Sequence, residues 1–402
     1  MNKENIKNAI LKRKFSILII IVLLIIIGVL FGQKQDSKFR LLYQYQAIPD
    51  IELTNTLTQT EADREWNKRI DDALATSECE ELPKPVYDNS LYQGPLTDTH
   101  FHLSTIADAT PGSSDDWKNE KLYTSPGVNM TFDDYACLLR NDGTSGKVFA
   151  FFPVYPNIEW QSLKLAKKAM EKYPDVFVPF INAPDGDIGS VDGPTLKRML
   201  SYYPGLFKGF GEQGLYEAAA PALPPDSERL IGTYPIVREN KLLVYFHLGE
   251  KQKDSYQKVL KANRDINFIF HGDQLISCGD GCDGTLKEID EILSNNPNVY
   301  YGIDELYGDV VLLNEKSTKE GIIDHLKNRE TLLRQDLATW KGFIERHPDQ
   351  VIWGTDRGSY LYSLDIEIGR TMVEHTRAFI AGLNPAVQEK FAYKNAEKLL
   401  KK

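Results

Sequence analysis

The feature that most constrains the fold is a regular alternation of predicted strands and helices that begins near residue 96. Apolar and aromatic runs of strand length recur there between stretches whose apolar residues follow a helical period. Strands that alternate with helices are typical of a parallel sheet, and eight such units fit a closed β/α barrel better than an open doubly wound sheet. We therefore predict an α/β fold, a (β/α)8 TIM-like barrel over residues 96–402, with strands in residues 96–103, 147–156, 176–184, 206–214, 242–249, 266–273, 299–305 and 351–358.

Amphipathic segments between and after these runs predict the helices of the barrel. They fall in residues 160–173, 250–264, 285–296, 318–347, 364–383 and 385–402. The sequence lacks the GxGxxG and P-loop motifs that would favour an open, nucleotide-binding sheet.

The N-terminal part contains one long apolar run. Residues 15–32 (FSILIIIVLLIIIGVLFG) are eighteen residues without a charge, just long enough for a helix to cross a bilayer. Basic residues are more frequent before the run than after it, which predicts a cytoplasmic tail (1–14), a single-pass transmembrane signal-anchor (15–32) and an extracytoplasmic catalytic domain. A cleaved signal peptide is the alternative, but the run exceeds the usual length and no A-x-A-like site follows.

Residues 33–95 are predicted to form a stem with a helix in residues 61–78. The stem either packs on the barrel or is a flexible spacer. Four cysteines in an outward-facing chain could form two disulfides. Cys278 and Cys282 could close a small ring and Cys79 and Cys137 could form the other pair, with free thiols as the alternative for a reducing compartment.

The charge balance limits the class of partner. The formal net charge is −10, which argues against a broad electrostatic surface for nucleic acid, because phosphate binding needs a surplus of Lys and Arg. We expect a small-molecule substrate and, through the N-terminal helix, a membrane. The oligomeric state is not indicated by the sequence.

Polar residues gather at the predicted ends of the strands. His100 and His102 share one face of the first strand because side chains alternate along a strand, and imidazoles so placed can bind one metal ion. In a β/α barrel the C-terminal strand ends converge on one face, so residues there are candidates for the site. They are His100, His102, Glu212, His247, His271 and Asp356; the other histidines, His325, His347 and His375, fall in predicted helices, where surface or capping roles suffice.

The set D-x-H-x-H, two later histidines and a late G-T-D resembles the metal-dependent amidohydrolase superfamily, which folds as a distorted (β/α)8 barrel. The resemblance covers roughly residues 95–400. VIWGTDRG is similar to the last-strand motif of the amidohydrolase-related branch, which includes many hydrolases and some non-oxidative decarboxylases. GFGEQGL is similar to the fourth-strand G-E-x-G-L of TatD-like nucleases.

The resemblance implies Zn²⁺ or another divalent metal, as one or two ions. It implies His100, His102, His247 and Asp356 as ligands of the first metal. His271 would be a ligand of a second metal or a catalytic histidine, and Glu212 a bridge between two ions. Lys208 lies four residues before Glu212 and would need to be carbamylated to serve as the fourth-strand ligand; we prefer Glu212, which lies nearer the strand end.

Such a metal lowers the pKa of bound water toward ~7, which makes hydrolysis the expected chemistry. Asp356 would act as general base and acid, and His271 or a second ion would polarise the scissile carbonyl or phosphoryl oxygen. Arg357 would hold a substrate carboxylate or phosphate, or equally a structural acid. Asp98 is expected to orient an imidazole or a loop, and Asp304 and Glu305 are weaker candidates.

We therefore predict a membrane-anchored metal-dependent hydrolase that acts on a C–N, ester or lactone bond of a small molecule. The alternatives are a TatD-like phosphodiesterase or nuclease, a non-oxidative decarboxylase, and a surface protein that binds metal or ligand without turnover. The sequence does not identify the substrate, because specificity in such barrels depends on the βα loops.

Overall fold

A computed structural model of the chain describes residues 59–77, 79–103, 130–144, 146–154, 159–182, 191–215, 223–249, 252–271, 286–304, 306, 319–357 and 365–401, without the side chains of residues 59–62 and of His271. The predicted tail and signal-anchor, the first part of the stem, and Cys278, Cys282 and Glu305 lie outside the described residues. Within the described ranges, no helix is long and apolar enough to cross a membrane.

The predicted barrel strands are all present. The strands are β1 (Phe101–His102), β2 (Val148–Pro153), β3 (Phe177–Asn182), β4 (Gly209–Gly214), β5 (Leu243–His247), β6 (Phe268–His271), β7 (Val299–Ile303) and β8 (Val351–Trp353), and they form one sheet in chain order. Every neighbouring pair is parallel. Backbone hydrogen bonds also join the two ends of the sheet, from Thr99 N–H to Trp353 O (3.0 Å) and from His102 N–H to Arg357 O (2.7 Å). The TIM-like α/β fold predicted from the alternation of strand and helix segments is therefore confirmed.

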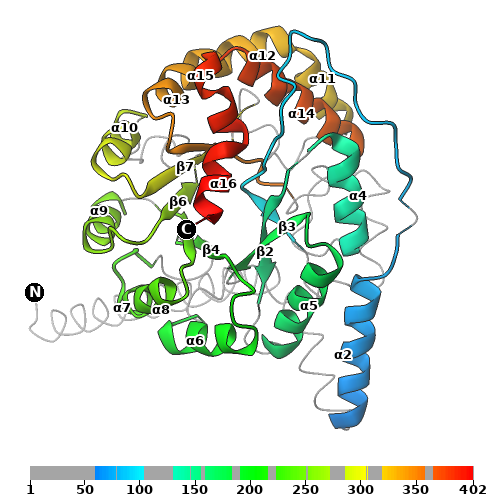
Figure 1. The fold of residues 1–402 in the computed structure, drawn as a ribbon, viewed down its shortest axis with the longest axis vertical. Coiled ribbons are helices and arrows are strands. Elements are labelled where there is room, and N and C mark those ends of the chain that lie inside the picture. Colours follow the sequence, from blue (N-terminus) through cyan, green and yellow to red (C-terminus); the bar gives the residue numbers. More distant parts are fainter. Residues whose placement is uncertain are drawn as a thin grey trace, which may run out of the picture. The chain divides into compact units, whose positions relative to one another are not determined.

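Helices surround the strands (Figure 1). Those that correspond to predicted segments are α2 (Gln59–Ala73), α5 (Glu159–Lys172), α9 (Lys253–Ala262), α10 (Leu286–Asn295) and α14 (Ile366–Ala381). The predicted helix 318–347 is divided into α11 (Lys319–Lys327), α12 (Arg329–Asp336), the π-helix η5 (Leu337–Lys341) and α13 (Gly342–Arg346). The predicted helix over residues 385–402 corresponds to α15 (Pro385–Glu389), η7 (Lys390–Lys394) and α16 (Asn395–Leu400). Four further helices were not predicted: α4 (Phe132–Asp142), α6 (Gly193–Tyr202), α7 (Glu228–Ile231) and α8 (Tyr234–Glu239).

The helix α4 has clear start and stop signals. The Thr131 side chain accepts a hydrogen bond from the Asp134 N–H, and the Asp134 carboxylate accepts one from the Thr131 N–H, which together form a capping box. The helix stops before Gly143, whose φ of 94° suits a residue without a side chain. This helix then packs against α14.

Every second residue of the strands points into the barrel, and these side chains form an apolar core. Phe149, Phe151, Phe180 and Tyr245 belong to this inner cluster, together with Leu399 of α16. Leu399 joins residues near the N-terminal ends of the strands, so α16 closes that end of the barrel, and Figure 1 shows it crossing in front of the strands. The opposite end, where the strands finish, is left for polar residues.

The described part of the stem packs on the barrel. Trp66 and Ile70 of α2 are buried, and Asp71 forms an ion pair with Lys168 of α5 at 2.9 Å. Cys79 and Cys137 form a disulfide with a Cα–Cα distance of 6.3 Å, which confirms one of the two predicted pairs. The disulfide joins the segment after α2 to α4.

Candidate metal centre

Two imidazoles at the end of β1 form the centre of the site. The Nε2 atoms of His100 and His102 lie 3.0 Å apart. His100 is fully buried, whereas the His102 side chain keeps 19% of its exposure. Because two imidazole lone pairs repel each other at this separation, the pair needs a shared proton or a cation between its nitrogens.

Asp356 completes a triangle of donor atoms with this pair. Its Oδ1 lies 3.2 Å from the Nε2 atom of His100 and 3.2 Å from that of His102. Neighbouring ligands bound about 2.0–2.2 Å from one ion are about 2.8–3.6 Å apart in tetrahedral or octahedral geometry, so the triangle fits a divalent metal. The three residues could therefore hold one metal ion. Asp356 has a φ of 51°, a left-handed conformation that is more common at functional positions.

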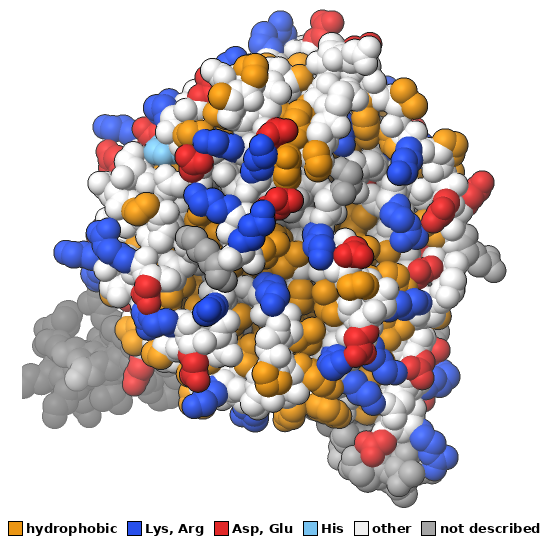
Figure 2. All heavy atoms as spheres, viewed as in Figure 1, with side chains coloured by type: hydrophobic (Ala, Val, Ile, Leu, Met, Phe, Trp, Pro, Cys, Tyr) orange, Lys and Arg blue, Asp and Glu red, His pale blue; other side chains and the backbone are white. Residues whose placement is uncertain are grey.

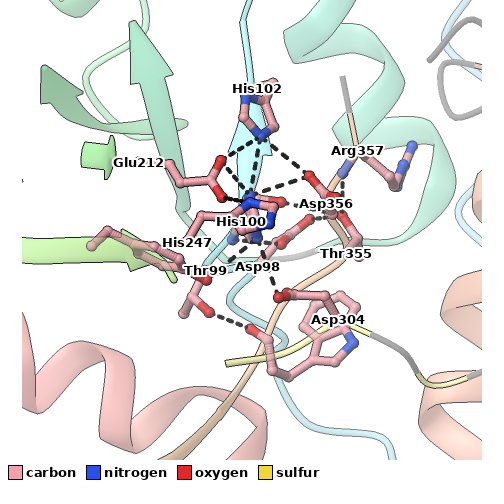
Figure 3. Close-up of polar contacts among 12 residues, drawn as sticks. Asp98, Thr99, His100, His102, Glu212, His247, Asp304, Thr355, Asp356 and Arg357 are labelled. Carbon is pink, nitrogen blue, oxygen red and sulfur yellow. Dashed lines mark hydrogen bonds and ion pairs between the residues drawn. The ribbon is translucent and has the colours of Figure 1, made fainter. Parts of the chain in front are cut away.

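Glu212 approaches the histidine pair from the side opposite Asp356 (Figure 3). Its Oε2 lies 3.3 Å from His102 Nε2 and 3.5 Å from His100 Nε2. Its other oxygen, Oε1, lies 2.6 Å from His247 Nδ1. A register shift between Phe210 and Gln213 adds one residue to β4 here, which turns Glu212 into the barrel.

The ionisable groups of this cluster shift one another's pKa values. Burial by itself raises the pKa of Glu212, but the neighbouring imidazoles of His247 and His100 lower that pKa well below its ordinary value. Burial lowers the pKa of His102, but hydrogen bonds to the carboxylates of Asp356 and Glu212 outweigh it and raise the pKa to about 9. A concentration of negative charge therefore surrounds the imidazoles, as a divalent cation requires.

A second set of contacts orients His100. Its Nδ1 lies 3.2 Å from Asp304 Oδ2 and 3.3 Å from the Tyr245 hydroxyl. Because the carboxylate accepts the Nδ1 proton, the basic nitrogen of His100 is Nε2, which faces His102 and Asp356. Burial raises the pKa of Tyr245 well above its ordinary value, and the carboxylate of Asp304 adds to this, so the hydroxyl stays protonated.

Asp98 links β1 to the segment after β8. This agrees with its expected role of orienting an imidazole or a loop. Its carboxylate accepts hydrogen bonds from the His100 backbone N–H (3.0 Å) and from the Thr355 hydroxyl (2.6 Å). Burial raises the pKa of Asp98 to about 7, although these two donors and Arg357 lower it. The contact fixes the position of Asp356 relative to the histidines.

Arg357 does not join the cluster. Its guanidinium donates from Nη1 to Asp142 Oδ2 at 2.6 Å, with both side chains buried, and it points away from His100 and His102 (Figure 3). Backbone pairing explains this direction, because Arg357 is bridged to Phe101, whose ring faces outward to Tyr135 of α4. Of the two roles considered for Arg357, the geometry supports pairing with a structural acid.

Lys208 also lies away from the site. Its side chain is exposed, and its Nζ donates to the Gly205 carbonyl at 3.1 Å, so the preferred fourth-strand residue, Glu212, is the one near the histidines. His271 is the last residue of β6, but its side chain lies outside the described residues, so its assignment as a metal ligand or catalytic group stays a prediction.

The remaining histidines have no part in the site. His347 pairs with Asp290 at 2.8 Å, and the buried His375 pairs with Asp336 at 2.7 Å. His347 is the C-cap residue of α13, as expected for a capping role, whereas the buried His375 joins α14 to α12. His325 is part of α11.

Tyr245, Thr355 and Asp142 are the contributors that sequence reasoning missed. Tyr245 precedes His247 by two residues on β5, so strand alternation could have placed it on the same face. No local pattern pairs Asp142 with Arg357, since 215 residues separate them.

Solved structures of amidohydrolases have a similar fold. An amidohydrolase from Burkholderia multivorans with bound zinc has a TM-score of 0.51 and 13% identity, and the match covers 77% of this chain and 99% of that chain. Another crystal form of it, with bound HEPES, has a TM-score of 0.51 and 14% identity over 77% and 99% of the two chains. A 2,6-dihydroxybenzoate decarboxylase has a TM-score of 0.43 and 13% identity over 77% and 100%.

No protein-family model matches the sequence, and no curated protein matches it significantly. At these identities, the similarity to the Burkholderia multivorans amidohydrolase is one of fold. It confirms the predicted α/β barrel fold. The resemblance of residues 209–215 to TatD-like nucleases stays a prediction.

Proposed function

We propose that this chain is a metal-dependent hydrolase that directs water onto a C–N, ester or lactone bond of a small molecule. The observation that carries the proposal is the triangle of His100, His102 and Asp356 donor atoms, separated by 3.0–3.2 Å at the strand ends. Zinc is the first metal to test, because the Burkholderia multivorans amidohydrolase of the same fold was solved with zinc.

A divalent metal, when bound, supplies a Lewis acid that activates water and polarises a substrate oxygen. Two carboxylates orient histidines toward the place where it would bind. Asp304 accepts the Nδ1 proton of His100 and so presents Nε2 to the site. Glu212 does the same for His247, since its Oε1 accepts the Nδ1 proton at 2.6 Å.

Asp356 is our candidate for proton transfer. Its carboxylate lies at the histidine pair and is 21% exposed, so it reaches both the buried ligands and the water-accessible side. One oxygen, Oδ1, faces the histidines, and we assign the transfer of a proton from water to the leaving group to the other oxygen, Oδ2. The carboxylate would then serve as base and acid in turn.

The test combines metal analysis with activity. We expect stoichiometric metal in the purified full-length chain and hydrolysis of a member of a panel of esters, lactones and amides. Asp356→Asn, which keeps the shape of the side chain, and His100→Ala should abolish turnover, whereas His325→Ala on α11 and Asp324→Asn, an exposed carboxylate, should not. Circular dichroism checks that each variant folds. A metal-free preparation that stays active in chelator would refute the proposal.

Cleavage of a phosphodiester is a second candidate, because Glu212 of the TatD-like motif lies within 3.5 Å of the histidine pair. Bis(4-nitrophenyl) phosphate in the same panel separates the two. Preferential cleavage of this diester, lost in Glu212→Gln, would favour the phosphodiesterase. Stoichiometric metal without turnover of any substrate would favour a binding protein.

We further propose that the barrel is held outside the cytoplasmic membrane by residues 15–32. The apolar run and its basic upstream residues support an anchor, and the Cys79–Cys137 disulfide is compatible with an oxidising space. Protease added to intact cells or spheroplasts should digest the barrel, and the full-length chain should remain in the membrane fraction after carbonate washing. Protection from protease would contradict this topology.

A further inference from the structure

A cavity of about 440 Å³ opens at the end of the barrel opposite the candidate metal centre. Residues at the start of three strands line it, among them Leu243 of β5, Asn267 before β6 and Asn298 before β7, together with Leu399 of α16. This volume is in the range of small-molecule sites. The cavity is therefore separate from the candidate metal centre, and no residue of that centre lines it.

The cavity has a positive lining in an acidic protein. Arg238, Lys241 and Arg264 line it with a single carboxylate, Asp265, whereas the whole chain has a net charge of −10. Arg238 is already paired with Asp265. Within the described part of the chain, Lys241 and Arg264 make no side-chain hydrogen bond or ion pair, so two positive charges are left for a ligand. Figure 2 views this end of the barrel and shows Lys and Arg side chains around α16.

Asn298 adds a fixed polar group to the wall of the cavity. It is 7% exposed, and its Nδ2 donates to the carbonyls of Ile266 (2.7 Å) and Asn263 (3.3 Å). Since only the amide nitrogen can face two carbonyl oxygens, the orientation of the side chain is settled. Its Oδ1 is buried and has no hydrogen-bond partner among the described residues. A buried acceptor without a partner favours a ligand that brings a hydrogen-bond donor.

We propose that this cavity is a second binding site, specific for a small anionic group that carries a hydrogen-bond donor. Lys241 and Arg264 would bind the phosphate or carboxylate, for which a guanidinium offers two parallel donors. The wall at Asn298 favours a hydroxyl or N–H group on the ligand, and apolar residues such as Leu242 and Ile266 would contact its carbon skeleton. A phosphorylated polyol has this chemistry, either as a soluble molecule or as the headgroup of an anionic lipid.

The experiment uses the full-length chain in detergent and compares two double variants with the same change in charge. Lys241→Gln with Arg264→Gln removes the two cations of the cavity. The control, Lys84→Gln with Lys197→Gln, removes two exposed lysines that do not line it. Calorimetric titration with inorganic phosphate and with glycerol 3-phosphate measures soluble anions, and flotation with phosphatidylglycerol or phosphatidylcholine vesicles measures a lipid headgroup.

We expect saturable binding of glycerol 3-phosphate, tighter than that of inorganic phosphate, in the wild type and in the control. Loss of the cavity cations should weaken it at least tenfold. Binding to phosphatidylglycerol vesicles alone, with the same dependence on the variant, would assign the anion to a lipid. Equal affinities of both double variants for every probe, or no saturable binding of any probe, would overturn the proposal. Anions at the metal centre do not confuse the result, because both variants retain that centre.

Discussion

Replacing Asp304 is the sharpest test of how the site is built, because it alters no atom of the donor triangle. The Asp304 carboxylate is 2% exposed and accepts the Nδ1 proton of His100 at 3.2 Å. Partners that orient a ligating histidine in this way typically contribute 10–100-fold to metal affinity, or about 1.4–2.7 kcal/mol. Asp304→Asn keeps a neutral acceptor, so we expect about a tenfold loss of zinc affinity. Asp304→Ala removes the acceptor, so we expect a loss near 100-fold.

Zinc affinity is measured by competition with a chromophoric chelator, at one pH and salt concentration. Tyr245→Phe is the matched control, because this hydroxyl also lies 3.3 Å from His100 Nδ1 but carries no charge; its loss should be under threefold. Gly354→Ala disturbs the same contact from the residue after β8, since a Cβ there would lie 2.1 Å from Asp304 Oδ1 and 2.9 Å from His100 Cβ. It should therefore mimic Asp304→Asn. Unchanged zinc affinity in a folded Asp304→Ala protein would refute this account.

Three further predictions concern stability and protonation. Asp142→Ala should destabilise the protein by about 3–5 kcal/mol in urea titrations, because it leaves the guanidinium of Arg357 buried without its carboxylate. Removal of the Cys79–Cys137 disulfide, which joins residues 58 positions apart, should lower the free energy of unfolding by about 4 kcal/mol, measured with and without reductant. The pKa of His102 near 9 lies above its unfolded value, so in metal-free protein its contribution to stability is present below pH ~6.5 and declines as the pH rises toward 9. Because a metal must displace that proton, zinc affinity should rise up to tenfold per pH unit between pH 7 and 9, with proton release in weakly buffered titrations; a flat profile would contradict it.

The sequence was sufficient to predict the barrel because two local patterns, apolar runs of strand length and apolar residues at helical spacing, determine its strands and helices. Apolar runs of strand length predicted all eight strands, and the helical period predicted the larger helices, such as α5 and α14. The helices α7 and α8 were missed because four and six residues are too few to show a helical period. Pro194 and Pro235 lie in the first turn of α6 and α8, where proline favours a helix start, and the start signals of these two helices and of α4 were not used. Their start signals, such as the capping box at Thr131, are visible once the helix is known.

The site residues could be predicted where their place in the site follows from their position along a single strand. Alternation placed His100 beside His102, and the ends of β4, β5 and β8 supplied Glu212, His247 and Asp356. Arg357 shows the limit of such reasoning. It follows Asp356 directly, yet its bridge to Phe101 directs its side chain away from the histidines, and only the folded barrel brings Asp142 to it.

The aromatic interior of the barrel surrounds one side of this polar cluster and leaves the other side open to solvent. The Phe151 ring lies 5.0 Å from the His100 ring and 5.2 Å from the His102 ring, and the Tyr245 ring lies 5.2 Å from that of His100. These rings keep water away from the barrel side of the imidazoles, and the low dielectric constant strengthens their contacts with carboxylates. His102 and Asp356 keep about a fifth of their side-chain exposure, so water reaches the donor atoms from the strand ends. The alternation that packs the core therefore also determines the side from which the substrate of the proposed hydrolase would enter.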